Sequence, residues 1–136
     1  MGILIDSDVL LDVLTYREPF VSSSRKVLEA CENGEQNGFI TPLILSNVYY
    51  ILRKSNPNSE VLRQLRALMT FIGVIAMNKE DVLRALNSKF KDLEDALQNS
   101  AAENSLETDI IVTRNTKDYK HSSISVMTPS EFVKTI

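Results

Sequence analysis

Asp6 stands where a short apolar stretch, Ile3 to Ile5, passes into apolar residues that recur at helical spacing. This pattern predicts a buried strand followed by a helix, with the Asp6 carboxylate at the junction. In an open parallel sheet, that junction lies at the carboxyl edge of the strands, where such folds bind their ligands. A carboxylate held there needs a partner charge, and a divalent metal ion is the partner we expect. The alternative is that Asp6 or Ser7 only caps the helix.

Two other oxygen-bearing side chains should reach the same edge. Asp95 is expected in the first turn of a helix over 92–105, and Asn115 follows a strand over 109–113. Neighbouring carboxylates raise each other's pKa, and a hard cation with oxygen ligands keeps both ionised. The pattern therefore predicts Mg²⁺ or Mn²⁺ rather than zinc, because histidines and cysteines are not clustered. Such a cation polarises a phosphoryl oxygen and activates water, so phosphodiester hydrolysis needs no histidine base.

Several side chains allow more than one interpretation. Asp92 is expected to cap the helix over 92–105, with metal ligation as the alternative, whereas ligation is favoured for Asp95 over a role at the helix dipole. Asp118 can be a ligand, a loop cap or a solvated side chain. Tyr49 and Tyr50 are expected in the core rather than as base-stacking platforms. The candidates for phosphate contacts, each with ordinary solvated surface as the favoured alternative, are Arg17, Arg53, Lys54, Arg114 and Lys117.

Composition narrows the class of protein. A net charge of −3 argues against a protein coated in basic charge for non-specific nucleic-acid binding, but not against a nuclease with local basic groups. The single cysteine, Cys31, falls at helical spacing and is expected as a core thiol. Neither a signal peptide nor an apolar run near about 18 residues is apparent, so we expect a reducing, cytoplasmic setting. The lone histidine, His121, gives no support to histidine-driven catalysis.

Strands and helices should alternate along the chain and form one α/β domain. The strands are predicted over 3–5, 38–41, 74–77, 109–113 and 125–127. One or two helices separate most successive strands, which predicts right-handed crossovers and a mostly parallel sheet covered on both faces. The helix over 42–54 carries apolar residues on more than one face, so it should be buried between neighbours. Another helix should run from about 60 to 72 and end at Gly73.

Four segments, in this order, resemble the PIN-domain family: ILIDSDVLLD at 3–12, TPLILSNVYYILR at 41–53, FKDLEDALQ at 90–98 and IVTRNTKDY at 111–119. Together they span nearly the whole chain. The resemblance implies a single domain over 1–136, a three-layer α/β/α fold with a five-stranded parallel sheet, and Mg²⁺- or Mn²⁺-dependent endoribonuclease activity. Many bacterial members resemble toxins of the VapC type, so it also implies an RNA substrate, an antitoxin partner and a homodimer.

The resemblance also assigns site residues. Asp6 matches the first family acid and Asp95 the third, while the usual helix glutamate falls on Asn47 and the usual acid after the fourth strand on Asn115. Asparagine can coordinate through its carbonyl oxygen but carries no charge, so metal binding should be weaker. We predict Asp6 and Asp95 as principal ligands, surrounded by Asn47, Asn115 and Asp118. The acids that could compensate for the missing charges are Asp8, Asp92 and Asp118.

Two rival functions remain open from the sequence. A site with fewer acids can belong to a PIN-like module that binds RNA or a partner without cutting. The Asp6 and Asp8 pair also resembles the nucleophile loop of haloacid-dehalogenase-like phosphatases. That family needs a downstream lysine and paired aspartates after a later strand, where this chain has Thr113, Arg114 and Asn115.

Overall fold

The computed structural model describes residues 2–136. Its centre is a five-stranded parallel sheet in the order β3-β2-β1-β4-β5. The strands are β1 (Gly2–Ile5), β2 (Asn37–Ile40), β3 (Ile72–Val74), β4 (Ile110–Val112) and β5 (Ser125–Met127). The helices are α1 (Ser7–Leu14), α2 (Val21–Glu32), α3 (Pro42–Arg53), α4 (Asn58–Leu68), α5 (Lys79–Leu86), α6 (Leu93–Asn104) and α7 (Pro129–Val133). A short 3-10 helix, η1 (Thr116–Tyr119), lies between β4 and β5.

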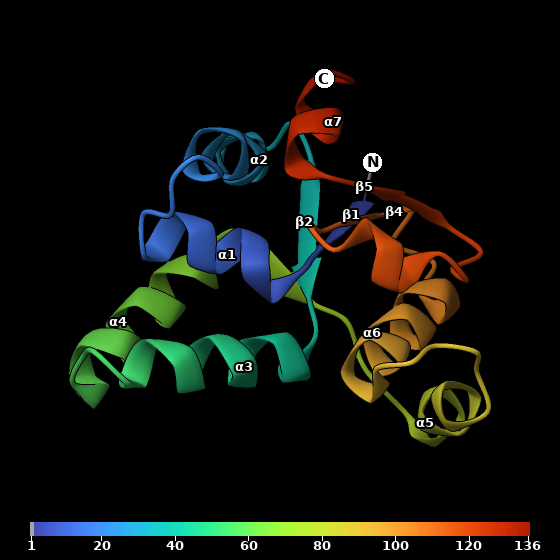
Figure 1. Cartoon of the computed structure of the whole chain (residues 1–136). Coiled ribbons are helices and arrows are strands. Elements are labelled where there is room, and N and C mark those ends of the chain that lie inside the picture. Colours follow the sequence, from blue (N-terminus) through green and yellow to red (C-terminus); the bar gives the residue numbers. More distant parts are fainter. Residues whose placement is uncertain (1) are drawn as a thin grey trace.

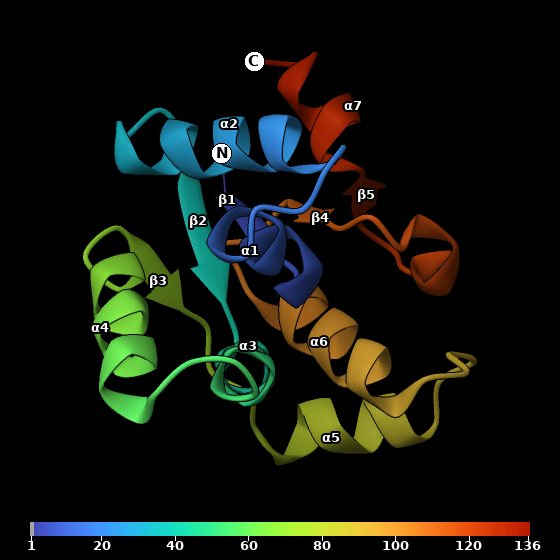
Figure 2. The same cartoon turned by 60° about the vertical axis from the view of Figure 1, so that its left-hand side comes forward.

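Helices cover both faces of the sheet. Figure 1 shows α1, α2 and α4 on one side of β2, and α5 and α6 on the other. The view in Figure 2 shows α2 beside α7, and α5 beside α6, two pairs that pack against each other. The predicted three-layer α/β/α fold with a parallel sheet is confirmed.

The central strand β1 organises the core. It pairs with β2 on one side and β4 on the other, and Ile3, Leu4 and Ile5 are fully or almost fully buried. A strand that is apolar on both faces is typical of a parallel sheet covered by helices. The strand order reverses at β1, so its carboxyl end is the switch point where open α/β sheets bind ligands. Asp6 is the next residue, and its backbone N–H donates to Val112 O at 3.0 Å.

One strand and one helix lie elsewhere than the sequence predicted. The helix expected to run to about 72 ends at Leu68, and the third strand covers Ile72–Val74 instead of 74–77. Gly73 therefore lies inside β3, opposite Phe39 of β2, instead of ending a helix. An apolar run this short fits a helix or a buried strand equally well, and the pairing with β2 decides between them.

The helix over 42–54 is less buried than predicted. Only one face of α3 is buried, through Ile44, Val48 and Leu52, because its packing partners α1 and α4 cover a single side. Tyr50 is 71% exposed, so its predicted place in the core is wrong. Tyr49 is half-buried, and its hydroxyl donates to Asn58 Oδ1 at 2.5 Å.

The prediction for Cys31 is confirmed, because its thiol is free and buried in the core. Burial raises its pKa to about 11, which keeps the thiol protonated. Across residues 2–136, none of the helices has both the length and the apolar character needed to cross a bilayer.

Close packing of α2 on β2 makes a prediction about Gly38. An added Cβ at this position would lie 2.7 Å from Cys31 Sγ and 2.8 Å from Ile72 Cδ1. We expect Gly38→Ala to lower the free energy of unfolding by about 1–3 kcal/mol through overpacking, measured by urea denaturation. Asn37→Ala, at an exposed site on the same strand, is the control and should change it by about 0.5 kcal/mol or less. Equal stability of Gly38→Ala and the wild type would contradict this packing.

Candidate active site

Asp6 is the centre of a hydrogen-bonded cluster at the carboxyl edge of the sheet. Its side chain is buried and accepts hydrogen bonds from four residues, each in a different segment. Oδ1 accepts from Ser7 N at 2.8 Å and from Gln98 Nε2 at 3.4 Å. Oδ2 accepts from Thr113 Oγ1 at 2.9 Å and from Tyr119 Oη at 3.4 Å. Asp6 therefore caps α1 and also joins α6, the end of β4 and η1 at one point.

The Tyr119 hydroxyl links Asp6 to Asp95. Its oxygen lies 3.4 Å from Asp6 Oδ2 and 3.3 Å from Asp95 Oδ1. Burial, followed by the charges of the two carboxylates, raises the pKa of Tyr119, so the hydroxyl stays protonated. A hydroxyl carries one hydrogen, so it can donate to only one of the two carboxylates at a time. The structure thus places residues 6 and 95 as neighbours. Asp6 accepts hydrogen bonds from three further residues, whereas the Tyr119 hydroxyl is the donor for the Asp95 side chain within residues 2–136.

Burial and neighbouring negative charges both act on Asp95. Its pKa is raised from 3.8 to about 7 by burial, followed by the charges of Asp6, Asp92 and Asp118, while the Tyr119 hydrogen bond lowers it. In the absence of a cation, this carboxyl group binds a proton near neutral pH. A nearby positive charge would favour its ionised form.

Asp8 belongs to the same cluster. Its Oδ2 accepts from Arg114 N at 3.0 Å and lies 3.5 Å from Thr113 Oγ1. Its Oδ1 is buried and has no hydrogen-bond partner within residues 2–136. Burial, with the charge of Asp6, raises the pKa of Asp8 to about 6, against the opposing effect of Arg114. Asp8 is therefore the best placed of the acids that could compensate for missing charges.

The contacts of Arg114 argue against the phosphate contact that was predicted for it. Its Nε and Nη2 donate to the two oxygens of the fully buried Asp12 at 2.9 and 3.0 Å. Its guanidinium also lies over the Phe20 ring, 3.9 Å from the centroid. These contacts pair the positive charge of Arg114 with a buried carboxylate, although the side chain is partly exposed. Among the predicted phosphate contacts, Lys117 lines the cleft next to Asp95, whereas Arg17, Arg53 and Lys54 do not.

The remaining predicted site residues lie at different distances from the cluster. Asp92 caps α6 by accepting from Asp95 N at 3.0 Å, as the sequence favoured. Asp92, Asp95 and Asp118 line one cleft. Asn47 Nδ2 donates to Glu94 Oε2 at 3.0 Å, so it reaches the first turn of α6 but makes no hydrogen bond to Asp6 or Asp95. Asn115 is exposed, and its backbone N–H, rather than its side chain, joins the cluster by donating to Thr113 Oγ1 at 3.0 Å.

Four residues of the cluster or its border were not predicted from the sequence. Gln98 and Glu94 lie on α6. Gln98 follows Asp95 by three residues, and this spacing places Gln98 and Asp95 on one face of the helix. Thr113 directly follows β4, where side chains at the carboxyl edge begin. Tyr119 had no sequence signal, because its position depends on the turn made by η1.

The donor set fits a hard cation. The available groups are carboxylate oxygens, one of them the unpartnered Asp8 Oδ1, and those of Asp6 and Asp95 repel each other. Hard cations such as Mg²⁺ and Mn²⁺ take such ligands. The described part of the chain holds no ready group of three histidine, cysteine, aspartate or glutamate side chains that could hold a metal. The ligand roles of Asp6, Asp95 and Asp92 stay predictions.

Fold and site together define an α/β domain with an acidic cluster at the switch point of a parallel sheet. The sequence model of the PIN domain matches residues 2–117. The chain therefore belongs to the PIN-domain family, whose members are generally nucleases. No curated protein matches the sequence. The phosphatase alternative gains no support from these comparisons.

Solved structures with a similar fold include toxin-antitoxin complexes. One from Klebsiella pneumoniae is 22% identical with a TM-score of 0.70, covering 93% of this chain and 97% of that chain. VapBC-1 from nontypeable Haemophilus influenzae is 13% identical with a TM-score of 0.69, covering 96% and 99%. VapBC2 from Rickettsia felis, bound to a promoter DNA fragment, is 16% identical with a TM-score of 0.67, covering 93% and 97%. These similarities show the fold.

The raised pKa of Asp95 predicts how stability depends on pH in a chelator. Between 3.8 and about 7 the folded state keeps a proton that the unfolded state has released, so stability falls as the pH rises through this window. Because Asp95 is partly exposed, we expect solvent screening to limit the loss to about 1–2 kcal/mol. Asp8, with a pKa of about 6, adds to the loss in the same direction.

Urea denaturation with EDTA at several pH values measures this dependence. Asp95→Asn should lose less stability than the wild type as the pH rises, because the side chain can no longer ionise. Glu35→Gln, at an exposed site outside the cluster, should follow the wild type. A wild-type stability that stays constant or increases between about pH 5 and 8 would contradict the assignment.

Proposed function

We propose that this protein is a Mg²⁺- or Mn²⁺-dependent endoribonuclease of the VapC type, the toxin of a toxin-antitoxin pair. The observation that carries the proposal is the Tyr119 hydroxyl shared by Asp6 and Asp95 at the switch point. Two carboxylates in this position, with one hydroxyl hydrogen between them, form a site that gains stability from a cation. Membership of a family of nucleases and the folds of toxin-antitoxin complexes support the same assignment.

The residues of the cluster have distinct roles in this mechanism. Asp6 and Asp95 would hold the cation, with Asp8, Asp92 and Asp118 as the nearest further carboxylates. A bound cation supplies an activated water and a polarised phosphoryl oxygen for phosphodiester hydrolysis. Donors from four residues fix the orientation of the Asp6 carboxylate.

Tyr119 and Asp95 would control protons near the reacting phosphate. Tyr119 stays protonated, so it acts as a hydrogen-bond donor that orients the two carboxylates and not as a base. Asp95, with a pKa of about 7 in the metal-free protein, would be held in its ionised form beside a bound cation. Asn47 and Asn115 carry no charge, so cation binding should be weaker than in a site with acids at both positions.

Cleavage of a labelled single-stranded RNA tests the proposal. We expect product with Mn²⁺ or Mg²⁺ and none with EDTA. Asp6→Asn should reduce kcat/KM by about 100-fold or more, since loss of even the groups that support metal ligands costs about 10- to 100-fold. Glu35→Gln, which also replaces an acid by its amide, should leave the rate unchanged. RNA binding without cleavage at any cation concentration would favour the alternative, a binding module that has lost activity.

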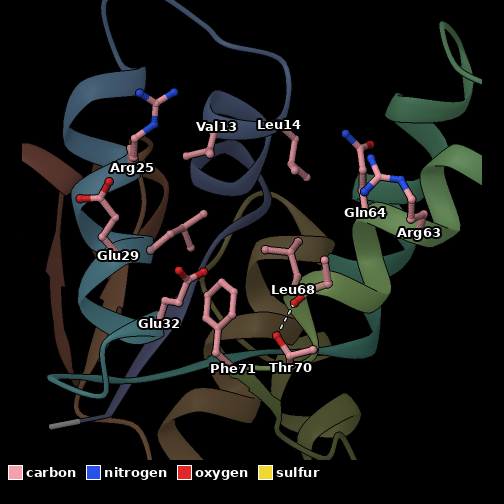
Figure 3. A pocket seen from close by; sticks show the side chains of 12 residues that line it. Val13, Leu14, Arg25, Glu29, Glu32, Arg63, Gln64, Leu68, Thr70 and Phe71 are labelled. Carbon is pink, nitrogen blue, oxygen red and sulfur yellow. Dashed lines mark hydrogen bonds between the residues drawn. The ribbon is translucent and has the colours of Figure 1, made fainter.

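The surface that we propose for the antitoxin is a groove beside the C-terminal end of α1. It has a volume of about 470 Å³ and lies between α1, α2 and α4. Figure 3 shows Leu14, Leu68 and Phe71 around it, with charged side chains of α2 and α4 at its borders. An apolar groove with a polar border fits one face of an amphipathic helix. We infer that a helix of the antitoxin binds here, because the similar structures include complexes of toxin and antitoxin.

Ala67 lines this groove from an exposed position on α4, so it allows a test with little effect on the core. Ala67→Lys should abolish co-purification of a protein that inhibits RNA cleavage from the native host. Ser59→Lys, on the same helix outside the groove, introduces the same charge and should retain that protein. Retention by both variants would exclude the groove as the antitoxin site. The homodimer and the cytoplasmic location stay predictions.

A further inference from the structure

Four lysines surround the acidic cleft. Lys89 and Lys91 lie in the loop before α6, Lys117 lies in η1, and Lys120 follows it; together we call them the lysine wall. They line a cavity of about 580 Å³ together with Asp92, Asp95 and Asp118. The chain has eight lysines and a net charge of −3, so half of its lysines gather at one recess of an acidic protein. The recess therefore has a local concentration of positive charge, although the chain as a whole is negatively charged.

The ammonium groups of the lysine wall are available to a ligand. All four lysines are exposed. The salt bridges found within residues 2–136 involve arginines only, so none of these lysines pairs with the three aspartates in the same recess. Lysine is a compact, mobile positive charge that binds phosphate as a point charge. Exposed lysines around a concave surface attract an anion that extends beyond the aspartates.

Phe90 connects the lysine wall to the acidic cluster. It lies between Lys89 and Lys91 in sequence and contacts the Tyr119 ring edge-on, with centroids 5.7 Å apart and an interplanar angle of 79°. The His121 ring also lies edge-on to Phe90, with centroids 6.4 Å apart. Since Tyr119 also bonds to Asp6 and Asp95, this packing holds the two lysine-bearing segments at a defined position beside the carboxylates.

We propose that the lysine wall binds the phosphodiester backbone of single-stranded RNA on the α6 side of the carboxylates. The choice of RNA rests on the proposed function, while binding itself requires no cleavage. A positive groove with aromatic rings nearby is the usual form of a site for single strands, and the exposed His121 ring offers a stacking surface. A phosphate must enter the recess to reach Asp95, which a flexible strand can do more readily than a helical duplex.

Contacts to the backbone away from the reacting phosphate are formed equally in the substrate complex and in the transition state. Their loss therefore raises KM and leaves kcat nearly unchanged. This separates the lysine wall from Asp6 and Asp95, whose replacement lowers kcat. The direct measurement of these contacts is therefore the affinity for RNA in a chelator, where no cleavage is expected.

The experiment measures the affinity of the full chain for a labelled single-stranded RNA of about 12 nucleotides in EDTA, over a range of salt concentrations. The two test variants are Lys89→Gln/Lys91→Gln and Lys117→Gln/Lys120→Gln. The matched control, Lys26→Gln/Lys134→Gln, removes the same charge from positions outside the cleft. For single strands, each lost phosphate contact should reduce the slope of log affinity against log salt by about 0.7, so by about 1.4 in each test variant. The control should keep the wild-type slope.

The outcomes distinguish this inference from the proposed function. Reduced slopes in the test variants would support the lysine wall even if the wild type cut no RNA with Mn²⁺, which would overturn only the proposed function. Unchanged slopes together with normal cleavage would overturn only the lysine wall. An equal reduction in the control would also overturn it, because general surface charge would then explain binding. The same titration with duplex RNA and with polyglutamate tests the choice of ligand. Equal affinity of the wild type for duplex RNA, or test variants that bind polyglutamate more weakly but single-stranded RNA normally, would overturn the assignment to single strands.

Discussion

The mutual repulsion of Asp6 and Asp95 is the constraint on which the candidate site depends. Asp6 accepts hydrogen bonds from four residues, whereas Asp95 has the shared Tyr119 hydroxyl, and burial followed by the charge of Asp6 raises the pKa of Asp95 to about 7. A proton relieves the repulsion in the metal-free protein, and a cation would relieve it while leaving both groups ionised. The same interaction therefore ties stability, pH dependence and metal binding to a single pair of residues.

An ion pair between the buried Asp12 and the partly buried Arg114 holds the neighbouring backbone in place. Asp12 is fully buried and accepts from the Arg114 guanidinium through both carboxylate oxygens. It also accepts a hydrogen bond from the hydroxyl of the fully buried Ser24. This anchors the segment after β4, whose Thr113 hydroxyl and Arg114 N–H orient Asp6 and Asp8. An arginine that looks available for phosphate in the sequence thus serves the shape of the site, because a buried carboxylate requires a partner charge.

Positive and negative charges share the recess without neutralising each other. Asp95 shares the Tyr119 hydroxyl with Asp6, while the four lysines lie in the loop before α6, in η1 and directly after it, and form no ion pair with the aspartates of the recess. Such a division suits a polyanion that must approach a cation: one group of charges binds the metal and the other binds the chain that carries the reacting phosphate. A uniformly acidic cleft would repel that ligand.

Local patterns in the sequence were sufficient for the parallel α/β fold, the edge position of Asp6 and the capping role of Asp92, because periodicity and caps depend on neighbours in the chain. They failed for Gly73 and Tyr50, whose surroundings come from β2 and from the single packed face of α3. The Tyr119 bridge, the capture of Arg114 by Asp12 and the grouping of four lysines were decided by tertiary structure alone. Each joins segments that are distant in sequence or turned by η1, and no local pattern encodes which side chains such packing brings into contact.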